Sequence, residues 1–167
     1  MIVRPAITAD LVAIDGVFRT SFCDTFAHLY DPADLATFLA GFTPAAWAAE
    51  FADPAYAFQV GEANGVVVGY AKLGPNKLPH VAPGDVIELK QLYLLKAAHG
   101  TGIGRALMEW VLAEARRRGA ERLALSVWSE NWRAQAFYKR YGFEDRGRMT
   151  FMVGNHPDED RVWEATL

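Results

Sequence analysis

Cysteine is almost absent from this sequence, since Cys23 is the only one among 167 residues. A single thiol cannot form an intrachain disulfide, and it excludes a zinc site built from several cysteines, so we expect no metal centre. No apolar run approaches the ~20 residues that a membrane-spanning helix requires, and the first residues lack the basic and then apolar pattern of a secretory signal. We therefore expect a cytoplasmic protein that is not inserted in a membrane.

An excess of positive charge is also missing. The chain has 17 Lys and Arg against 20 Asp and Glu, a formal net charge of -3. This balance excludes the broad positive field with which many proteins attract nucleic acid. What is present is an ordinary globular composition, with 51% hydrophobic and 22% charged residues and no internal repeat. We predict one domain over residues 1–167.

Strands and helices alternate along the predicted chain. Strands are expected at residues 2–4, 56–61, 66–73, 86–95, 122–128, 143–151 and 162–167. Helices are expected from Thr8 onward, across the aromatic stretch 22–51, and over 102–118 and 131–141. The expected fold class is α/β (α+β), with a mixed, mostly antiparallel sheet of six to seven strands and about four helices. A central strand–helix–strand unit over residues 86–128 is expected to be parallel.

Local signals support these boundaries. Thr8, Asp31 and Thr43 are suitable N-caps, and the last two precede proline, which is favoured at the first helical position. Asn64-Gly65 lies between two predicted strands and predicts a tight hairpin. The polar run 155–160 predicts a turn before the last strand.

The segment His99-Gly100-Thr101-Gly102-Ile103-Gly104-Arg105 joins a predicted strand to the strongest predicted helix. Alternate glycines let the backbone approach a ligand with its N–H groups turned inward, and the helix adds its positive N-terminal end. Such a loop favours a phosphate or pyrophosphate. Two alternatives are a simple helix-start turn and a Rossmann loop. The Rossmann spacing is Gly-x-Gly-x-x-Gly, whereas this loop has Gly-x-Gly-x-Gly and no acidic residue at the end of strand 122–128.

Two motifs follow one another in a characteristic order. The first consists of Leu92-Tyr93-Leu94, His99–Gly104 and Arg105-Ala106-Leu107, and the second of Asn131, Ala134, Phe137-Tyr138 and Gly142-Phe143. Together they resemble the acetyl-CoA-binding core of the GNAT acetyltransferases. The resemblance implies a single-domain GNAT fold and an N-acetyltransferase that uses acetyl-CoA as co-substrate. The family's loop usually begins with Gln or Arg, and His99 holds that place here.

The resemblance also implies which residues hold acetyl-CoA. In the GNAT fold two parallel strands splay apart before the loop, and their unpaired backbone groups bind the amides of pantetheine. The family's asparagine bonds the same arm, although Asn131 is also a suitable helix cap. The expected cofactor-binding residues are Leu92, Tyr93, Leu94, His99, Gly100, Thr101, Gly102, Ile103, Gly104, Arg105 and Asn131.

Glu88 is the candidate general base. An aliphatic amine has a pKa of about 10, so only about one molecule in a thousand is nucleophilic at pH 7. The resemblance places a glutamate in this role on the strand that leads to the loop. By alternation, Glu88 is expected to share a strand face with Lys90, Leu92 and Leu94. The alternative is a structural carboxylate paired with Lys90 or another cation.

Tyr138 is the candidate general acid, because a phenol can protonate the departing sulfur and the family's tyrosine lies beside it. The alternative is an aromatic core residue, since Phe137, Tyr138 and Tyr141 crowd one helix. Cys23 lies among apolar residues without an adjacent histidine. We therefore expect direct attack by the amine in a ternary complex.

A narrower resemblance concerns the acceptor. It is carried by Ser21-Phe22, Asp24-Thr25-Phe26, Ile87-Glu88-Leu89, Leu92-Tyr93, Val127-Trp128, Tyr138-Lys139 and parts of the tail 151–167. These patches are similar to the PaiA-type spermidine/spermine acetyltransferases, which implies a polyamine as the primary amine. The stretch 22–51 is expected to cover the acceptor and to suit a polycation. Its candidate side chains are Asp24, Phe26, His28, Tyr30, Asp31, Asp34, Phe38, Phe42, Trp47 and Glu50.

Two other functions stay open at this point. One is acetylation of a peptide or protein amine, and the other is a non-catalytic module that binds acyl-CoA and regulates. The presence of both Glu88 and Tyr138 disfavours the module. The expected partner is a small-molecule amine, with no nucleic acid and no membrane, and the sequence is compatible with a monomer or a homodimer.

Overall fold

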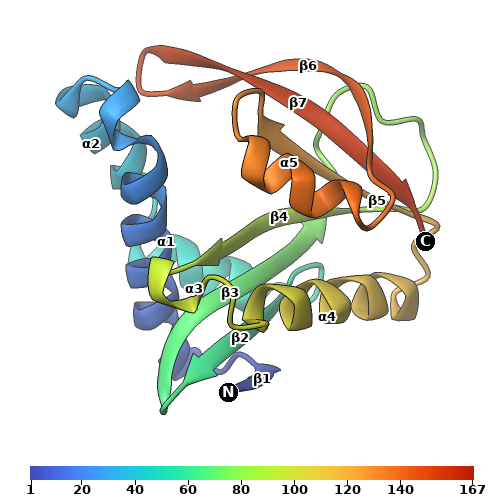
Figure 1. Cartoon of the computed structure of the whole chain (residues 1–167), viewed down its shortest axis with the longest axis horizontal. Helices are drawn as coiled ribbons and strands as arrows, with labels where there is room; N and C mark the ends of the chain where they lie inside the picture. The colour runs from blue at the N-terminus through green and yellow to red at the C-terminus, as the bar shows by residue number, and fades with distance from the viewer.

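A seven-stranded mixed sheet forms the centre of the computed structural model, which describes residues 1–167 (Figure 1). The strand order is β1-β2-β3-β4-β5-β7-β6, and β4–β5 is the one parallel pair. The strands are β1 (Ile2–Pro5), β2 (Ala57–Ala63), β3 (Val66–Pro75), β4 (Val86–Leu94), β5 (Arg122–Trp128), β6 (Glu144–Val153) and β7 (His156–Thr166). The mixed, mostly antiparallel sheet predicted from the sequence is confirmed.

The chain contains five α-helices and three short 3-10 helices. They are η1 (Thr8–Asp10), α1 (Leu11–Phe26), η2 (Ala27–Leu29), α2 (Pro32–Ala40), α3 (Pro44–Ala52), η3 (Lys96–Ala98), α4 (Ile103–Arg117) and α5 (Trp132–Lys139). This agrees with the expected number of about four α-helices, and Asp31-Pro32 and Thr43-Pro44 each begin a helix as predicted. The Asp31 side chain accepts the Ala33 N–H at 2.9 Å, and the Thr43 hydroxyl accepts the Ala46 N–H at 3.1 Å.

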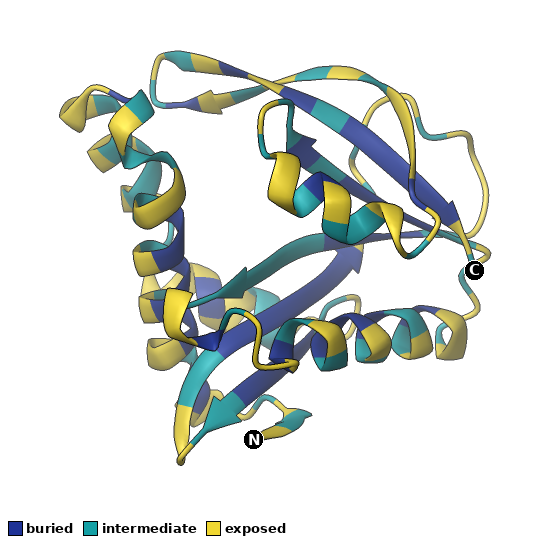
Figure 2. Cartoon of the chain, in the orientation of Figure 1, coloured by how far each residue is buried: buried dark blue, intermediate teal, exposed yellow.

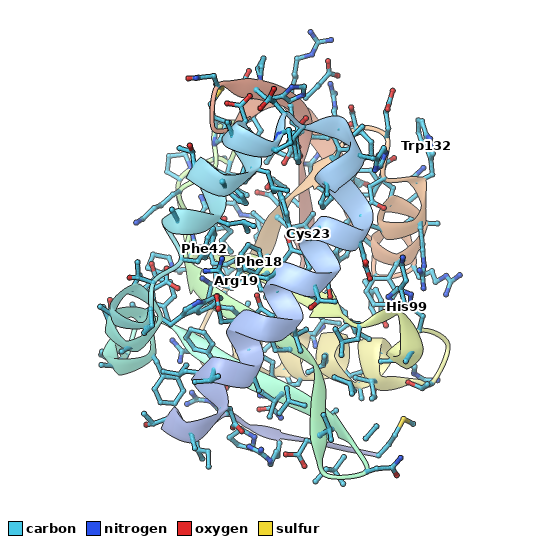
Figure 3. All side chains as sticks on the ribbon, turned by 90° about the vertical axis from the view of Figure 1, so that its left-hand side faces the viewer. Phe18, Arg19, Cys23, Phe42, His99 and Trp132 are labelled. Atoms are coloured by element: carbon cyan, nitrogen blue, oxygen red, sulfur yellow. The ribbon has the colours of Figure 1, made fainter.

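The sheet divides the hydrophobic core into two clusters, and the buried positions concentrate on its central strands (Figure 2). One cluster packs α4 against the sheet through Leu107, Met108 and Val111. The other packs α1 and α3 through Phe18 and Trp47. Phe18 also meets Phe42, with ring centroids 4.3 Å apart (Figure 3). None of the helices is both long enough and apolar enough to cross a lipid bilayer.

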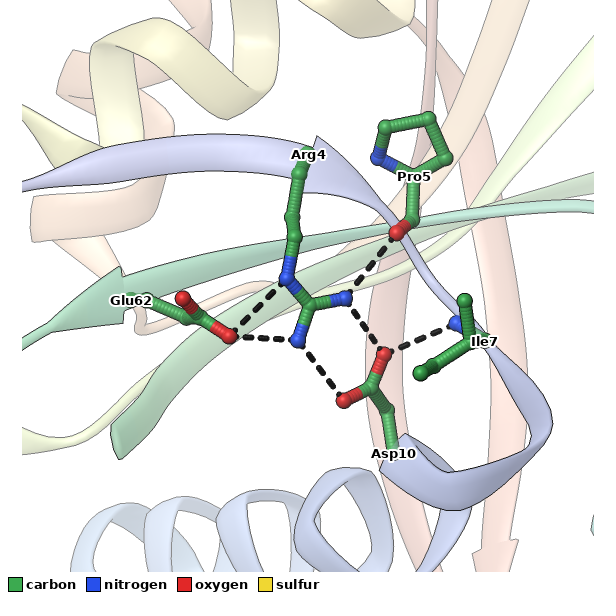
Figure 4. Close-up of polar contacts among 5 residues, drawn as sticks. All are labelled: Arg4, Pro5, Ile7, Asp10 and Glu62. Carbon is green, nitrogen blue, oxygen red and sulfur yellow. Dashed lines mark hydrogen bonds and ion pairs between the residues drawn. The ribbon is translucent and has the colours of Figure 1, made fainter. Parts of the chain in front are cut away.

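The start of α1 differs from the prediction that Thr8 caps it. Thr8 is the first residue of η1, and the Asp10 carboxylate accepts the Ile7 N–H at 2.8 Å. Arg4 on β1 donates two hydrogen bonds to Asp10, at 2.7 and 2.9 Å, and it also binds Glu62 on β2 (Figure 4). The Arg4 guanidinium lowers the pKa of Asp10. This ion-pair cluster therefore joins β1, β2 and the first turn, which the sequence pattern alone did not indicate.

The last strand also differs from its prediction, since β7 begins at His156 and not at residue 162. The run 155–160 was expected to be a turn because it is polar. In the structure the turn is shorter, and Val153 pairs with His156 while Met149 pairs with Asp160. Asp160 also opposes Trp128 on β5. Two neighbouring strands thus hold this polar segment in the sheet.

Candidate functional site

The parallel strands β4 and β5 pair over three residues only and then diverge. Val86, Ile87 and Glu88 face residues 122–124, and no pairing continues beyond this point. β4 runs on to Leu94 and β5 to Trp128, so their facing backbone groups lack a neighbouring strand. This is the splay that the family resemblance implies, and two adjoining cavities lie along it.

The larger cavity has a volume of about 900 Å³, and its walls come from the end of α1, the end of β4, the glycine loop and α5. Nine predicted cofactor residues line it: Leu92, Tyr93, Leu94, His99, Gly100, Gly102, Gly104, Arg105 and Asn131. Thr101 and Ile103 do not. The Thr101 hydroxyl donates to the Ala98 carbonyl at 2.7 Å, and the Ile103 side chain is buried in the core. Only the backbone groups of these two residues are left to contact a ligand in the cavity.

The glycine loop has the properties of an anion cradle. Gly100 and Gly102 have φ values of 76° and 92°, in the left-handed region that favours glycine. A Cβ added at either position would meet no atom within 4 Å, so both glycines face open space. Gly102 is the N-cap of α4, and no side chain caps this helix. Its first N–H groups are therefore free to bind phosphate oxygens.

Positive side chains surround this loop. Lys96, Arg105, Arg133 and Arg140 line the large cavity, against one carboxylate, Asp24. This excess of positive charge suits the phosphates of coenzyme A. Sequence reasoning missed Lys96 and Arg133 as cavity residues. Lys96 lies just before the predicted loop and Arg133 just after Asn131, and these positions could have indicated both residues.

His99 serves as a partner for Arg133. The Arg133 Nη1 atom lies 2.7 Å from His99 Nδ1, so the imidazole accepts the hydrogen bond. Burial, followed by the charge of Arg133, lowers the pKa of His99. The neutral ring can hold Arg133 at the cavity, which is a positioning role rather than a proton-transfer role.

Tyr138 and Asn131 stand where the two cavities meet. Both line the large cavity and a second one of about 330 Å³. Burial raises the pKa of Tyr138, so its phenol keeps its proton at neutral pH. The Asn131 carbonyl oxygen caps α5 by accepting the Ala134 N–H at 3.2 Å, which leaves the amide NH₂ group for a ligand. The cap and the ligand interpretations of Asn131 are therefore compatible.

The second cavity lies between the diverging strands and is lined mainly by hydrophobic residues, many of them aromatic. Its aromatic wall consists of Phe18, Phe22, Phe26, Tyr30, Phe38, Phe42, Tyr93, Trp128, Tyr138 and Phe151. Four of the expected acceptor aromatics are thus present, whereas Trp47 lies in the core and His28 lines neither cavity. Apolar and aromatic walls with a few polar groups are typical of small-molecule sites.

The polar groups of the second cavity include two aspartates from β7. Asp158 and Asp160 are each 8% exposed. The Tyr30 hydroxyl donates to Asp158, and His156 Nε2 lies 3.3 Å from its other oxygen. Asp160 has no cationic partner, and burial, followed by repulsion from Asp158, raises the pKa of Asp160 to about 7. Sequence reasoning missed both residues because it assigned the polar run 155–160 to a turn.

The carboxylates expected at the acceptor site lie elsewhere. Asp31 caps α2, Asp34 accepts the Asn155 N–H, and Glu50 pairs with Lys72 at 2.5 Å. Asp24 lines the large cavity, 3.6 Å from Lys96. Cys23, on α1 in Figure 3, lines neither cavity. None of these groups lines the second cavity.

Glu88 also lies outside both cavities. Its carboxylate accepts hydrogen bonds from the Lys90 ammonium at 2.6 Å and from the Lys77 N–H at 2.9 Å, so the ion pair that was the alternative to a catalytic role is formed. The predicted common face with Leu92 and Leu94 was wrong, because the register between β3 and β4 shifts by one residue after Leu89. Leu92 and Leu94 pack with Leu89 against the α4 cluster instead. A catalytic role for Glu88 stays a prediction.

Comparison with known proteins places this geometry in a family. The model of the acetyltransferase (GNAT) family matches residues 21–143. An uncharacterized N-acetyltransferase of Mycobacterium tuberculosis is 40% identical over 139 residues, which cover 81% of this chain and 84% of that protein.

Solved structures share the fold over nearly the whole chain. The PaiA N-acetyltransferase of Thermoplasma acidophilum, in complex with coenzyme A, has a TM-score of 0.75 at 18% identity and covers 99% of this chain and 98% of its own. The yncA structure of Salmonella typhimurium, with its cofactor acetyl-CoA, has a TM-score of 0.72 at 24% identity over 100% and 94% of the two chains. With the glycine loop, the diverging strands and the paired motifs all in place, this chain belongs to the GNAT family and is an N-acetyltransferase that uses acetyl-CoA as its co-substrate.

Proposed function

We propose that the enzyme acetylates a small primary amine that carries positive charge, and that polyamines such as spermidine and spermine are the acceptor class. The observation that carries this proposal is the second cavity, which Asp158 and Asp160 line together with aromatic side chains and which adjoins the cofactor cavity at Tyr138. Buried carboxylates attract an ammonium group, and aromatic faces add cation–π attraction.

The residues divide the work between the two cavities. The backbone of Leu92–Leu94 and the N–H groups of the glycine loop hold acetyl-CoA, which supplies the activated acetyl group. The amine enters from the aromatic side and attacks directly in a ternary complex. Tyr138 lies at the junction and donates its proton to the leaving sulfur.

Thiol release from acetyl-CoA across a panel of amines tests this proposal. The panel contains spermidine, spermine, aminoglycosides, amino acids and short peptides. Rapid release with the polyamines is the expected result. Release with peptides alone would replace the polyamine by a peptide or protein amine. Tight binding of acetyl-CoA without release on any amine would favour a regulatory module.

A further inference from the structure

Asp160 is the buried carboxylate whose charge nothing in the chain balances. Asp158 has the Tyr30 hydroxyl and His156, and Glu88 has Lys90. Asp160 takes part in none of the salt bridges, although it is only 8% exposed. Ser126, which lines the same cavity, is the one side chain that favours its charged form. A buried carboxylate without a cation is costly, so the arrangement fits a positively charged ligand.

The position of Asp160 relative to Tyr138 suits chemistry as well as binding. Both residues line the second cavity, and so does Tyr93. Tyr138 also borders the cofactor cavity. An amine nitrogen held between Asp160 and Tyr138 therefore lies at the junction where it can meet the acetyl group.

We infer that Asp160 is the general base of this enzyme and takes a proton from the ammonium group of the acceptor. Asp158 and Tyr30, which are hydrogen-bonded to each other, are positioning residues for this part of the cavity. This inference rests on the proposed amine acceptor. It differs from the prediction for Glu88, whose carboxylate is already paired and lines neither cavity.

The proton and bond changes balance. The acceptor ammonium gives one proton to Asp160, which later releases it to solvent. The neutral nitrogen forms a C–N bond to the acetyl carbon as the C–S bond breaks. Tyr138 donates its proton to the leaving sulfur, and the second proton lost by nitrogen restores the phenol. The products are the N-acetylated amine, free thiol and one proton in solution.

The surroundings of Asp160 define its expected pH response. The charged or titratable groups on the same cavity wall are Asp158, Tyr30, Tyr93, Tyr138, Lys72 and Lys90. Lys72 and Lys90 are paired with Glu50 and Glu88. Burial, followed by the charge of Asp158, therefore disfavours ionisation of Asp160. Because a base must be ionised, kcat/KM is expected to rise with pH through a midpoint near 7.

The experiment compares Asp160→Asn, Glu88→Gln and the matched control Glu159→Gln. Glu159 lies between the two aspartates on the same strand but is exposed. With the amine that the wild type accepts, Asp160→Asn should lower kcat/KM by about 100-fold or more and remove the rise near pH 7. Glu159→Gln should stay within about twofold of the wild type. Affinity for coenzyme A should be unchanged in all three.

A second measurement does not depend on turnover. Without acetyl-CoA, the accepted amine should raise the melting temperature of the wild type at pH 8, and Asp160→Asn should lose most of this shift. The inference is overturned if Asp160→Asn keeps the pH profile, or if Glu88→Gln alone removes the rise. A wild type that acetylates no cationic amine would overturn the proposed function itself. The wild-type and variant results thus separate the two failures.

Discussion

Burial of Asp160 makes its ionised form unfavourable in the folded protein. Its pKa in the folded protein is raised to about 7, whereas an aspartate in an unfolded chain titrates near 3.9. As pH rises from about 4 to about 7, the unfolded state loses its proton first, so the free energy of unfolding falls. Above pH 7 the cost of the buried charge is fully present.

Asp160→Asn should therefore stabilise the protein at alkaline pH. We expect the free energy of unfolding to rise by about 2–4 kcal/mol at pH 8.5 and to change little at pH 4. Urea unfolding of the variant and the wild type at the two pH values measures the difference. Equal effects at both pH values would contradict a raised pKa.

Tyr138→Phe isolates the role of the phenol. The ring still packs against Phe137 and Phe143, whose centroids lie 5.4 and 5.7 Å away, so the fold should be kept. Loss of the proton donor is expected to lower kcat by about 100-fold with little change in the KM for acetyl-CoA. Steady-state thiol release gives both constants. A large rise in KM with normal kcat would instead assign Tyr138 to binding.

At the scale of elements, the glycine loop and the start of α4 form one anion-binding unit. Gly102→Ala places a side chain in the left-handed region, which costs about 1–2 kcal/mol, without any clash. We expect weaker coenzyme A binding, measured by calorimetry. Gly16→Ala is the matched control, because Gly16 lies exposed in α1 and an added Cβ there also meets nothing. This control should stabilise the helix by about 0.5–1 kcal/mol and leave binding unchanged.

Elements that depend on local signals were predictable from the sequence. Asp31 and Thr43 cap helices as expected, and Asn64-Gly65 adopts the positive φ values of a tight hairpin. The loop at Gly100–Gly104 carried the family resemblance. These features need only a few neighbouring residues, so a single sequence contains them.

The position of Asp158 and Asp160 in the second cavity could not be predicted in the same way. The segment 156–160 is polar, and local propensity therefore favours a turn. It is a strand because β5 and β6 pair with it from both sides, through contacts distant in sequence. The expected face of Glu88 failed for a related reason, since a register shift is set by the neighbouring strand β3.

At the scale of the whole molecule, two cavities that share a wall favour a direct transfer. Leu92, Asn131 and Tyr138 border both, whereas Cys23 borders neither. Initial-velocity lines should therefore intersect when both substrates are varied, and Cys23→Ser should keep kcat within about twofold. Parallel lines together with an acetylated cysteine in mass spectra would instead indicate a covalent enzyme intermediate.

The short pairing of β4 with β5 has a consequence for the dynamics of the sheet. Only residues 86–88 tie the strands β1–β4 to β5, β7 and β6 through a ladder. The amides of β4 that face the opening lack a strand to protect them, so they should exchange hydrogen for deuterium rapidly in the free enzyme. Coenzyme A would occupy that edge and slow their exchange, and the two parts of the sheet would then open less independently.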